Sequence, residues 1–456
     1  MNIGIILAAG EGTRMKSKTP KVLHEIVGKK IIQYVLDACD RGNINKKVLI
    51  LGHGKEMILE ELKKEKVDWK EQPMGKEKPY GTGYAAMQAV DFIEDNSTVV
   101  ILNGDVPLIE GDTINKFIEF HKKNKNIASV LTADIDNPFG YGRIIRENNQ
   151  IKGIVEEKDA SSEEKRIKEI NSGIYCFNGK ELKKILGELD NDNSQNEYYI
   201  TDGIKKVAEK GQKVGGYKIS DIIQIKGVNN RIQLSELVKE EKLRINKKHM
   251  LNGVTLVDPN NTYIEKDVEI GIDTIIYPNT FLEGKTVIGE DNIIGPGTRI
   301  QSSKIGRNNE IENSKIIKST LKDYNKIGPY AYIRPKCKIG SKVKIGDFVE
   351  IKNTSIGDNS KASHLAYLGD GEIGKNVNVG CGVIFVNYDG KKKSKTIIKD
   401  GAFVGSNSNL VAPITINEGA YIACGSTITE EVEKNALAIG RARQVTKINK
   451  GKDRYK

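Results

Sequence analysis

The sequence has few aromatic residues, few cysteines and no long apolar run, and each shortage excludes a class of protein. No stretch approaches the roughly 20 consecutive apolar residues that a membrane-spanning helix needs. The five cysteines form no CxxC pair and no metal-ligand spacing, which suits a reduced cytoplasm. The first seven residues lack a basic region and lead into a glycine loop, so we expect no signal peptide.

The chain is basic, but the distribution of its charge argues against nucleic acid as a partner. Its formal net charge is +11, yet lysines are interleaved with acidic residues and aromatics make up only 6%. Nucleic-acid-binding proteins usually gather their cations into patches with aromatic residues between them. We favour a solvated, lysine-rich surface. A basic binding module is the alternative, and salt-sensitive DNA binding without turnover of UTP would support it.

The second half of the chain repeats an aliphatic residue every six positions, with two shifts of phase. The repeat comprises Ile264, Ile270, Ile276, Leu282, Ile288, Ile294 and Ile300; Ile305, Ile311 and Ile317; Ile327, Ile333, Ile339, Ile345 and Ile351; and Ile398, Val404, Leu410, Ile416, Ile422 and Ile428. A period of six fits neither an amphipathic helix nor a plain sheet. It predicts a β-solenoid in which each hexapeptide forms one strand and one corner, with three sides to a coil.

A glycine often follows the aliphatic residue, as in Ile270-Gly271 and Ile339-Gly340. We interpret this glycine as easing the corner, because it accepts backbone angles that a Cβ forbids. The spacing does not give the hand of the winding, although the general rule for parallel crossovers would make it right-handed.

The first half begins with a buried strand over residues 3–9 and a glycine loop, Gly10-Glu11-Gly12-Thr13-Arg14. A strand followed by such a loop is how α/β proteins bring backbone N–H groups to phosphates. Arg14 and Lys21 add cationic donors suited to a triphosphate. A tight turn with surface charges is the alternative interpretation.

A second apolar strand, residues 99–102, leads to Asp105 in the sequence Asn-Gly-Asp-Val-Pro. It would place a hard oxygen ligand at the crevice where α/β sheets bind their ligands. An Asx-turn or a helix cap is the alternative. Further along, residues 230–250 place apolar residues among Lys and Glu at helical spacing, which predicts a linker helix. We therefore divide the chain into 1–229, 230–250 and 251–456.

A set of polar residues interrupts the six-residue repeat. It includes Arg334, Lys352, the segment from Lys361 to Asp370, Asn378 and a loop around residues 387–393. Within it, His364 is of the residue type that removes protons near neutral pH. A lone histidine is more often a hydrogen-bonded structural residue. A solenoid can also be a scaffold without any activity.

These motifs resemble a known family. LAAGEGTRM, PKVL, GTG, NGDVPL, NPFGYGRI, GIVEEKDA, INSGIY and GVNNRIQL are similar to the nucleotidyltransferase half of the bifunctional bacterial N-acetylglucosamine-1-phosphate uridyltransferase and glucosamine-1-phosphate acetyltransferase. The polar interruptions resemble its acetyltransferase half. The resemblance implies an α/β fold: a Rossmann-like nucleotidyltransferase domain (1–229), then a left-handed parallel β-helix (251–456).

The function implied by the resemblance is a two-step synthesis of UDP-N-acetylglucosamine for cell-wall precursors. Acetyl-CoA would acetylate glucosamine 1-phosphate, and UTP would then react with the product in the presence of Mg²⁺. The implied enzyme is a cytoplasmic homotrimer assembled through the β-helix, with no nucleic-acid or membrane partner. The alternative is a sugar-1-phosphate nucleotidyltransferase whose β-helix is purely structural.

The resemblance also implies residue roles. In the first half, the uridine nucleotide would contact Leu7, Ala8, Ala9, Gly10, Lys21, Gln72, Gly81 and Thr82; the sugar Gly142, Glu156 and Asn171; and the metal Asp105 and Asn229. In the second half, His364 would be the catalytic base, Arg334, Lys352, Lys393, Tyr367 and Asn378 would bind the sugar phosphate, and Asn387, Tyr388, Ser406 and Arg441 would contact acetyl-CoA.

This chain departs from the family pattern in four places. Extra residues stand within Pro73–Tyr80, and Tyr84 replaces the usual histidine, so we expect a reshaped uracil pocket. Cys381 and Cys424 stand where alanine is usual, and we expect both to line the coenzyme pocket as small residues or modifiable thiols.

Overall fold

The computed structural model describes residues 1–75, 78–193 and 195–455. The chain forms two compact units, Met1–Glu241 and Lys242–Lys456. The boundary between them falls inside helix α7 (Arg231–Leu251), which occupies the segment where we expect a linker helix. Our domain limits stay a prediction. Within the described ranges, no helix combines the length and the apolar character needed to cross a membrane.

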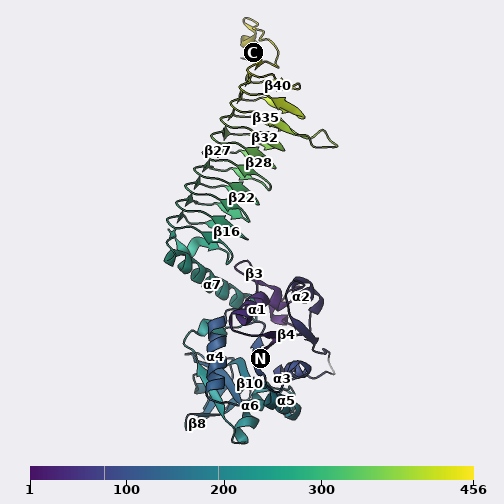
Figure 1. The fold of residues 1–456 in the computed structure, drawn as a ribbon, viewed down its shortest axis with the longest axis vertical. Coiled ribbons are helices and arrows are strands. Elements are labelled where there is room, and N and C mark those ends of the chain that lie inside the picture. Colours follow the sequence, from purple (N-terminus) through teal and green to yellow (C-terminus); the bar gives the residue numbers. More distant parts are fainter. Residues whose placement is uncertain (76–77, 194, 456) are drawn as a thin grey trace. The chain divides into compact units, whose positions relative to one another are not determined.

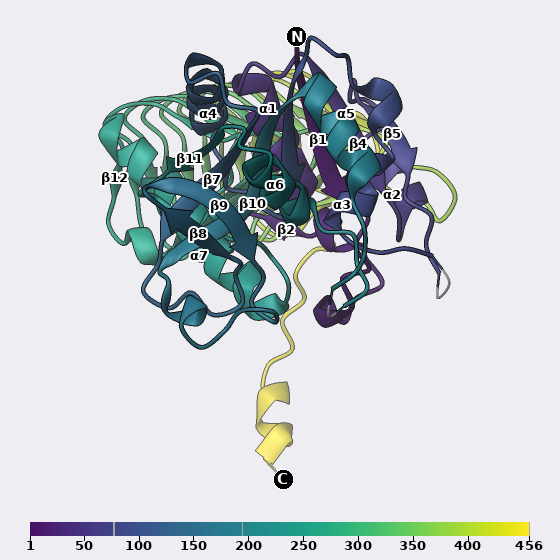
Figure 2. The ribbon, with the colours of Figure 1, turned by 90° about the horizontal axis from the view of Figure 1, so that it is seen from below.

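The first unit contains one mixed β-sheet with helices on both faces (Figure 2). Its strands are β1 (Asn2–Ala8), β4 (Lys46–Leu51), β5 (Asp68–Glu71), β6 (Thr98–Asn103), β7 (Ala128–Asp134), β8 (Arg143–Glu147), β9 (Gln150–Val155), β10 (Glu169–Asn178) and β11 (Val214–Lys218). The main order is β11-β7-β10-β6-β1-β4-β5. Strands β6, β1, β4 and β5 are parallel, and β10 is antiparallel to both its neighbours.

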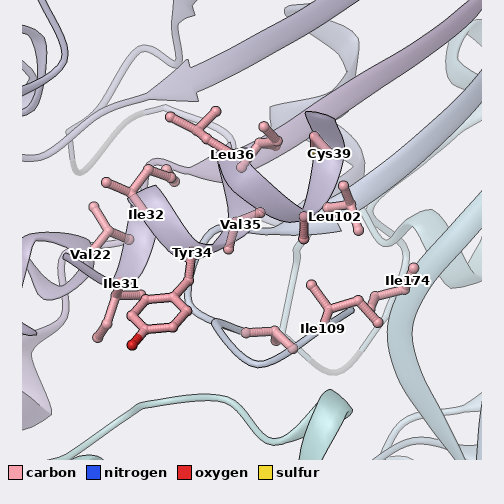
Figure 3. Close-up of a cluster of buried hydrophobic side chains, with 14 of the residues drawn as sticks. Val22, Ile31, Ile32, Tyr34, Val35, Leu36, Cys39, Leu102, Ile109 and Ile174 are labelled. Atoms are coloured by element: carbon pink, nitrogen blue, oxygen red, sulfur yellow. The ribbon is translucent and has the colours of Figure 1, made fainter. Parts of the chain in front are cut away.

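Two hydrophobic cores lie on opposite faces of this sheet, because successive strand residues point to opposite sides. Ile6 and Leu102 belong to one core, and Ile5 and Ile101 to the other. The first core also receives α1 (Ile31–Arg41) and α4 (Gly111–Lys123), and the second receives α3 (Thr82–Met87), α5 (Gly179–Glu188) and α6 (Ile200–Glu209). In Figure 3 the apolar face of α1 packs in the first core, where burial raises the pKa of the Cys39 thiol to about 12.

The second unit is a parallel β-helix with three sides. Its strands form three stacked sheets, from β12 (Thr255–Leu256) to β41 (Leu437–Ala438), from β13 (Thr262–Ile264) to β40 (Thr427–Ile428), and from β14 (Glu269–Ile270) to β38 (Ile414–Ile416). Each coil adds one strand to each sheet (Figure 1). The aliphatic residues of the repeat point inward; Ile264, Ile333 and Val404, for example, are fully buried. The predicted solenoid is confirmed.

The phase of the repeat differs from our prediction at one strand. In β22 (Lys315–Ile317) the inward residue is Ile316, which is fully buried, whereas Ile317 is partly exposed. Ile316 pairs with Ile300 in the coil before it and Ile333 in the coil after it. The prediction of Ile317 is wrong because two neighbouring sides, between Ile311 and Ile316 and between Ile316 and Leu321, are one residue shorter than six.

The glycines that follow the aliphatic residues have a different cause from the one we expected. Gly271 and Gly405 do not have positive φ angles. A Cβ on Gly271 would lie 2.6 Å from the backbone of Gly289 in the next coil, and one on Gly405 would lie 2.6 Å from Cys424 N. These glycines therefore permit close stacking of the coils. Several positive-φ corners are instead taken by Asn and Asp, as at Asn308.

Candidate active sites

A cleft of about 340 Å³ lies in the first unit beside the carboxyl ends of its parallel strands. It is lined by Leu7, Ala8, Ala9, Gly10, Pro20, Lys21, Val22, His53, Gln72, Tyr80, Gly81, Thr82, Ala85, Asn103, Asp105 and Glu197. The register of β1 with β6 places Leu7 beside Asn103, so the chain segments that follow both strands meet there. Open α/β sheets bind ligands at this edge. The structure thus brings every predicted nucleotide contact into one cleft.

At the polar centre of this cleft, two cationic side chains donate hydrogen bonds to two side-chain oxygens. Lys21 Nζ forms an ion pair with Asp105 Oδ2 and lies 3.4 Å from Asn229 Oδ1. Arg14 Nη2 donates to the same Asn229 oxygen over 2.9 Å. The side chains of Lys21 and Asp105 are only 15% and 22% exposed, so water screens this pair weakly.

Hydrogen bonds of the backbone hold Asp105 and Asn229, which carry these oxygens, beside each other. Val228 N donates to Asp105 O over 2.9 Å, and Asn229 N donates to Gln233 Oε1 over 2.8 Å. The Lys21 ammonium lies within reach of both side chains, so these oxygens can share a cation. Carboxylate and amide oxygens suit Mg²⁺. Among the described residues no group of three or more His, Cys, Asp or Glu could hold a metal, so substrate phosphates and water would complete the coordination.

The three residues predicted to bind the sugar also lie together. A Cβ on Gly142 would lie 3.2 Å from Glu156 Oε2 and 3.4 Å from Asn171 Cβ. Burial raises the pKa of Glu156, against a hydrogen bond from Thr201. Asn171 connects this group to the nucleotide cleft through Gly173, whose N–H donates to Asn171 Oδ1 over 3.0 Å.

Gly173 O in turn accepts a hydrogen bond from Asn103, which lines the cleft. These hydrogen bonds connect Asn171 to the wall of the nucleotide cleft, whereas Glu156 lines a separate cavity.

The region predicted to bind uracil contains the residues in which this chain departs from its family. Gln72 is buried in the cleft wall. Gly81 has a φ of +115°, and a Cβ there would lie 2.2 Å from Tyr198 O, so only glycine fits. The ring of Tyr84 lies 6.3 Å from that of Tyr198. Residues 76–77 of the extra segment lie outside the described residues, and a reshaped uracil pocket stays a prediction.

In the second unit, His364 lies at an edge of the β-helix. Its Nδ1 is 2.6 Å from Asp347 Oδ1 in the preceding coil. The ring is 58% exposed, so it is open to a ligand. Asp347 and His364 end strands β27 (Lys344–Asp347) and β30 (Lys361–His364), which pair in parallel with these two residues in register. The structure therefore orients an accessible imidazole through one carboxylate.

A pair of lysines, Lys352 and Lys393, lies in the same coils. Side-chain contact with Lys352, followed by the repulsion of its charge, lowers the pKa of Lys393. Burial raises the pKa of Asp370, but hydrogen bonds from Asn353 and Asn387 and the nearby lysine charges outweigh burial and hold it below its usual value. Two ammonium groups held together favour binding of a phosphate, whereas the Asp370 carboxylate beside them opposes it.

Arg334 and Tyr367 adjoin this pair of lysines. Strand β28 (Glu350–Lys352) pairs with β31 (Tyr367–Gly369), which places Lys352 beside Gly369. A Cβ on Gly369 would lie 2.5 Å from Tyr367 Oη, so this glycine leaves room for the tyrosine. Arg334 follows the equivalent strand one coil earlier and donates to Glu350 Oε1 over 2.7 Å.

Three of the residues predicted to contact acetyl-CoA follow one row along the β-helix. Ile345, Ala362, Val379, Val404 and Ile422 pair from coil to coil inside the helix. Two positions after them stand Asp347, His364, Cys381, Ser406 and Cys424, which we call the edge row. Cys424 is exposed and Cys381 partly exposed. The candidate base and three candidate coenzyme contacts therefore share one edge.

The other residues predicted to bind the sugar or the coenzyme, Asn378, Asn387, Tyr388 and Arg441, lie outside the edge row. Asn378 pairs with Lys361 on the sheet that carries His364. Asn387 is buried, and Tyr388 is exposed with its hydroxyl donating to Gly390 O within its own loop. Arg441 is exposed beside Gly425. Asn387 adjoins the predicted sugar-phosphate residues, because its side chain donates to Asp370 Oδ2 over 2.7 Å.

Our sequence analysis missed Asp347, Glu350 and Asp370 as site residues. The signal that finds them is the length of one coil. Asp347 and His364 are 17 residues apart, as are Asn353 and Asp370. In a β-helix, side chains separated by one coil are neighbours, so this spacing pairs residues that look distant in sequence.

Comparison with known proteins agrees with this arrangement. Residues 3–222 match the nucleotidyl transferase family, and residues 318–353 match the bacterial transferase hexapeptide family (six repeats). The predicted fold class is confirmed: an α/β, Rossmann-like nucleotidyltransferase domain followed by a left-handed parallel β-helix of hexapeptide repeats. The chain is a transferase.

Similar proteins cover almost its whole length. It is 53% identical to bifunctional protein GlmU of Clostridioides difficile over 97% of this chain and 96% of that protein. Those of Alkaliphilus metalliredigens and Acetivibrio thermocellus are also 53% identical, over 97% and 98% of this chain and 96% of each relative. With both halves matched in order, the chain belongs to the family of bifunctional protein GlmU.

Proposed function

We propose that the two units divide the synthesis of UDP-N-acetylglucosamine between them. The β-helix transfers an acetyl group from acetyl-CoA to glucosamine 1-phosphate. The nucleotidyltransferase unit then joins the product to UTP and releases pyrophosphate. The supporting observation is that each unit combines paired cations with the group its reaction needs. These are Arg14 and Lys21 beside Asn229 and Asp105, and Lys352 with Lys393 in the coils that carry His364. A purely structural β-helix would need none of the second set.

In the β-helix, His364 removes a proton from the amino group of glucosamine 1-phosphate as that nitrogen attacks the thioester carbonyl. A C–N bond forms, the C–S bond breaks and coenzyme A leaves. Lys352, Lys393 and Arg334 hold the sugar phosphate, and Tyr367 and Asn378 orient the sugar. The acetyl-CoA contacts are Asn387, Tyr388, Ser406 and Arg441, with Cys381 and Cys424 beside them.

In the first unit, an oxygen of the sugar 1-phosphate attacks the α-phosphate of UTP in line, and pyrophosphate leaves. Such a transfer needs positioning and neutralisation of charge. Arg14 and Lys21 supply cations, and Gly142, Glu156 and Asn171 position the sugar. When bound to Asp105 and Asn229, Mg²⁺ neutralises charge on the phosphates.

We infer a homotrimer assembled through the β-helix, working in the cytoplasm on cell-wall precursors. The β-helix has flat sides that carry exposed aromatic residues, such as the stacked pair Phe403 and Tyr421 with ring centroids 4.7 Å apart. Packing of such sides between copies would also bring residues of a second chain to the edge row, where the coenzyme is proposed to bind. A monomer in solution with full acetyl transfer would contradict this.

The test follows both products in one reaction with glucosamine 1-phosphate, acetyl-CoA, UTP and Mg²⁺. The native chain is expected to release coenzyme A and pyrophosphate. Asp105→Ala should release only coenzyme A. His364→Ala should release pyrophosphate only when N-acetylglucosamine 1-phosphate is supplied. Near-normal pyrophosphate release by Asp105→Ala, or coenzyme A release by His364→Ala, would refute the corresponding role.

A further inference from the structure

The contact between His364 and Asp347 is the short polar contact that orients the proposed base. Their side chains meet at 2.6 Å across adjacent coils of the edge row. The backbone supports the pair, because Leu365 N donates to Asp347 O over 2.9 Å. Both residues therefore stay in register through the stacking of the β-helix and not through a flexible loop.

The chemistry of this contact selects one form of the imidazole. The hydrogen bond with His364, followed by a backbone hydrogen bond, holds the pKa of the Asp347 carboxyl below its usual value. An ionised carboxylate only accepts hydrogen bonds. Nδ1 must therefore carry a proton, and in the neutral ring Nε2 is left with the lone pair.

Exposure makes this restraint necessary. The imidazole is 58% exposed, and no other hydrogen bond of its ring nitrogens is present among the described residues. A ring on an edge with so little packing would otherwise rotate and exchange tautomers. A surface ion pair contributes little to stability, so the contact is better explained by orientation than by folding.

We propose that Asp347 is the positioning residue of acetyl transfer, holding His364 as the Nδ1–H tautomer so that Nε2 receives the proton of the sugar amine. This rests on the proposed function of His364. The carboxylate also stabilises the imidazolium that forms when Nε2 is protonated. Asp347 touches neither substrate nor coenzyme in this role.

The experiment compares Asp347→Leu, Asp347→Asn and the control Asp358→Asn in the full chain. Asp358 stands in the same β-helix, but its carboxylate accepts from Ser341 N instead of a histidine. Asp347→Leu is expected to lower kcat for acetyl transfer by roughly 10- to 100-fold, the usual effect of losing the partner of a functional histidine. KM for both substrates should change less than about twofold, because such a residue contacts neither.

Asp347→Asn separates orientation from charge, since its amide oxygen can accept the same hydrogen bond. It should retain more activity than Asp347→Leu. Nitrogen-15 NMR of labelled histidine should show the Nδ1–H tautomer of His364 in the native chain and in Asp347→Asn, and a mixture in Asp347→Leu. Uridylyl transfer to supplied N-acetylglucosamine 1-phosphate should be unchanged in all variants, and an unchanged melting temperature of the β-helix unit verifies its folding.

Native kcat in Asp347→Leu, or an unchanged tautomer, would overturn the inference. If Asp347→Leu does not fold, the tautomer of His364 and kcat are measured in Asp347→Asn instead. A variant that loses the Nδ1–H form but keeps full activity would overturn the positioning role. His364→Ala distinguishes the role of His364 as the base from the role of Asp347 as its positioning residue. Full acetyl transfer by that variant would refute the proposed base itself, whereas its inactivity beside a fully active Asp347→Leu would refute only the positioning role.

Discussion

Replacing Lys21 by Gln is expected to disable uridylyl transfer selectively. The Lys21 ammonium contacts Asp105 and lies 3.4 Å from Asn229 Oδ1, where phosphate charge would collect. A unit charge about 4 Å from another contributes roughly 4 kcal/mol at the effective dielectric of a partly buried site. If the transition state uses most of this, kcat falls by roughly 100- to 1,000-fold, since about 1.4 kcal/mol corresponds to tenfold.

The assay is steady-state release of pyrophosphate from UTP and N-acetylglucosamine 1-phosphate at saturating Mg²⁺. Lys18→Gln is the matched control, because Lys18 is an exposed lysine three residues earlier. Acetyl transfer by the same preparations should be unchanged, and an unchanged melting temperature of the first unit verifies its folding. A kcat within about threefold of native for Lys21→Gln would refute the electrostatic role, since no strong Coulomb term could then be acting.

Three further predictions concern strain, pH and thiols. Gly81→Ala should lower the free energy of unfolding by about 1–3 kcal/mol and raise KM for UTP, because its Cβ would meet Tyr198 O at 2.2 Å. Gly187→Ala is the control and should change neither quantity, because nothing lies within 4 Å of its Cβ. Equal melting temperatures of the two variants would contradict this prediction. Burial lowers the pKa of His121 to about 4 from 6.5. The unfolded chain therefore binds a proton at His121 more tightly than the folded chain does, and the free energy of unfolding should fall by up to about 3 kcal/mol as pH drops from 6.5 to 4. In His121→Gln the midpoint of urea denaturation should depend less on pH over this range. Acetyl-CoA should slow alkylation of Cys381, measured by peptide mass, and an unprotected Cys381 would place the coenzyme elsewhere.

Much of the fold follows from the sequence because burial imposes a period. The repeat of six predicts the β-helix, since every side must bury an aliphatic residue. It does not predict that Ile316 rather than Ile317 points inward, because a side can lose one residue while the coils remain stacked. The sequence also does not reveal why the coils need these glycines, because the close approach of neighbouring coils exists only in the folded β-helix.

The candidate sites were predictable where their chemistry lies in one motif. Asp105 at the end of a strand and His364 within a polar interruption are visible in the sequence. Their partners are not, because Asn229 is separated from Arg14 by 215 residues and Asp347 from His364 by one coil. Motifs that resemble a family place Asn229, whereas Asp347 becomes visible only when the length of each coil is known.

The loop around residues 387–394 projects from the β-helix beside β35 (Thr396–Ile398) (Figure 1). Ile373 nevertheless pairs directly with Ile398 in the following coil. Insertions or deletions at this corner therefore leave the coils on either side in step. Exchanging this loop would therefore replace Asn387, Tyr388 and Lys393 together while the coils on either side keep their pairing.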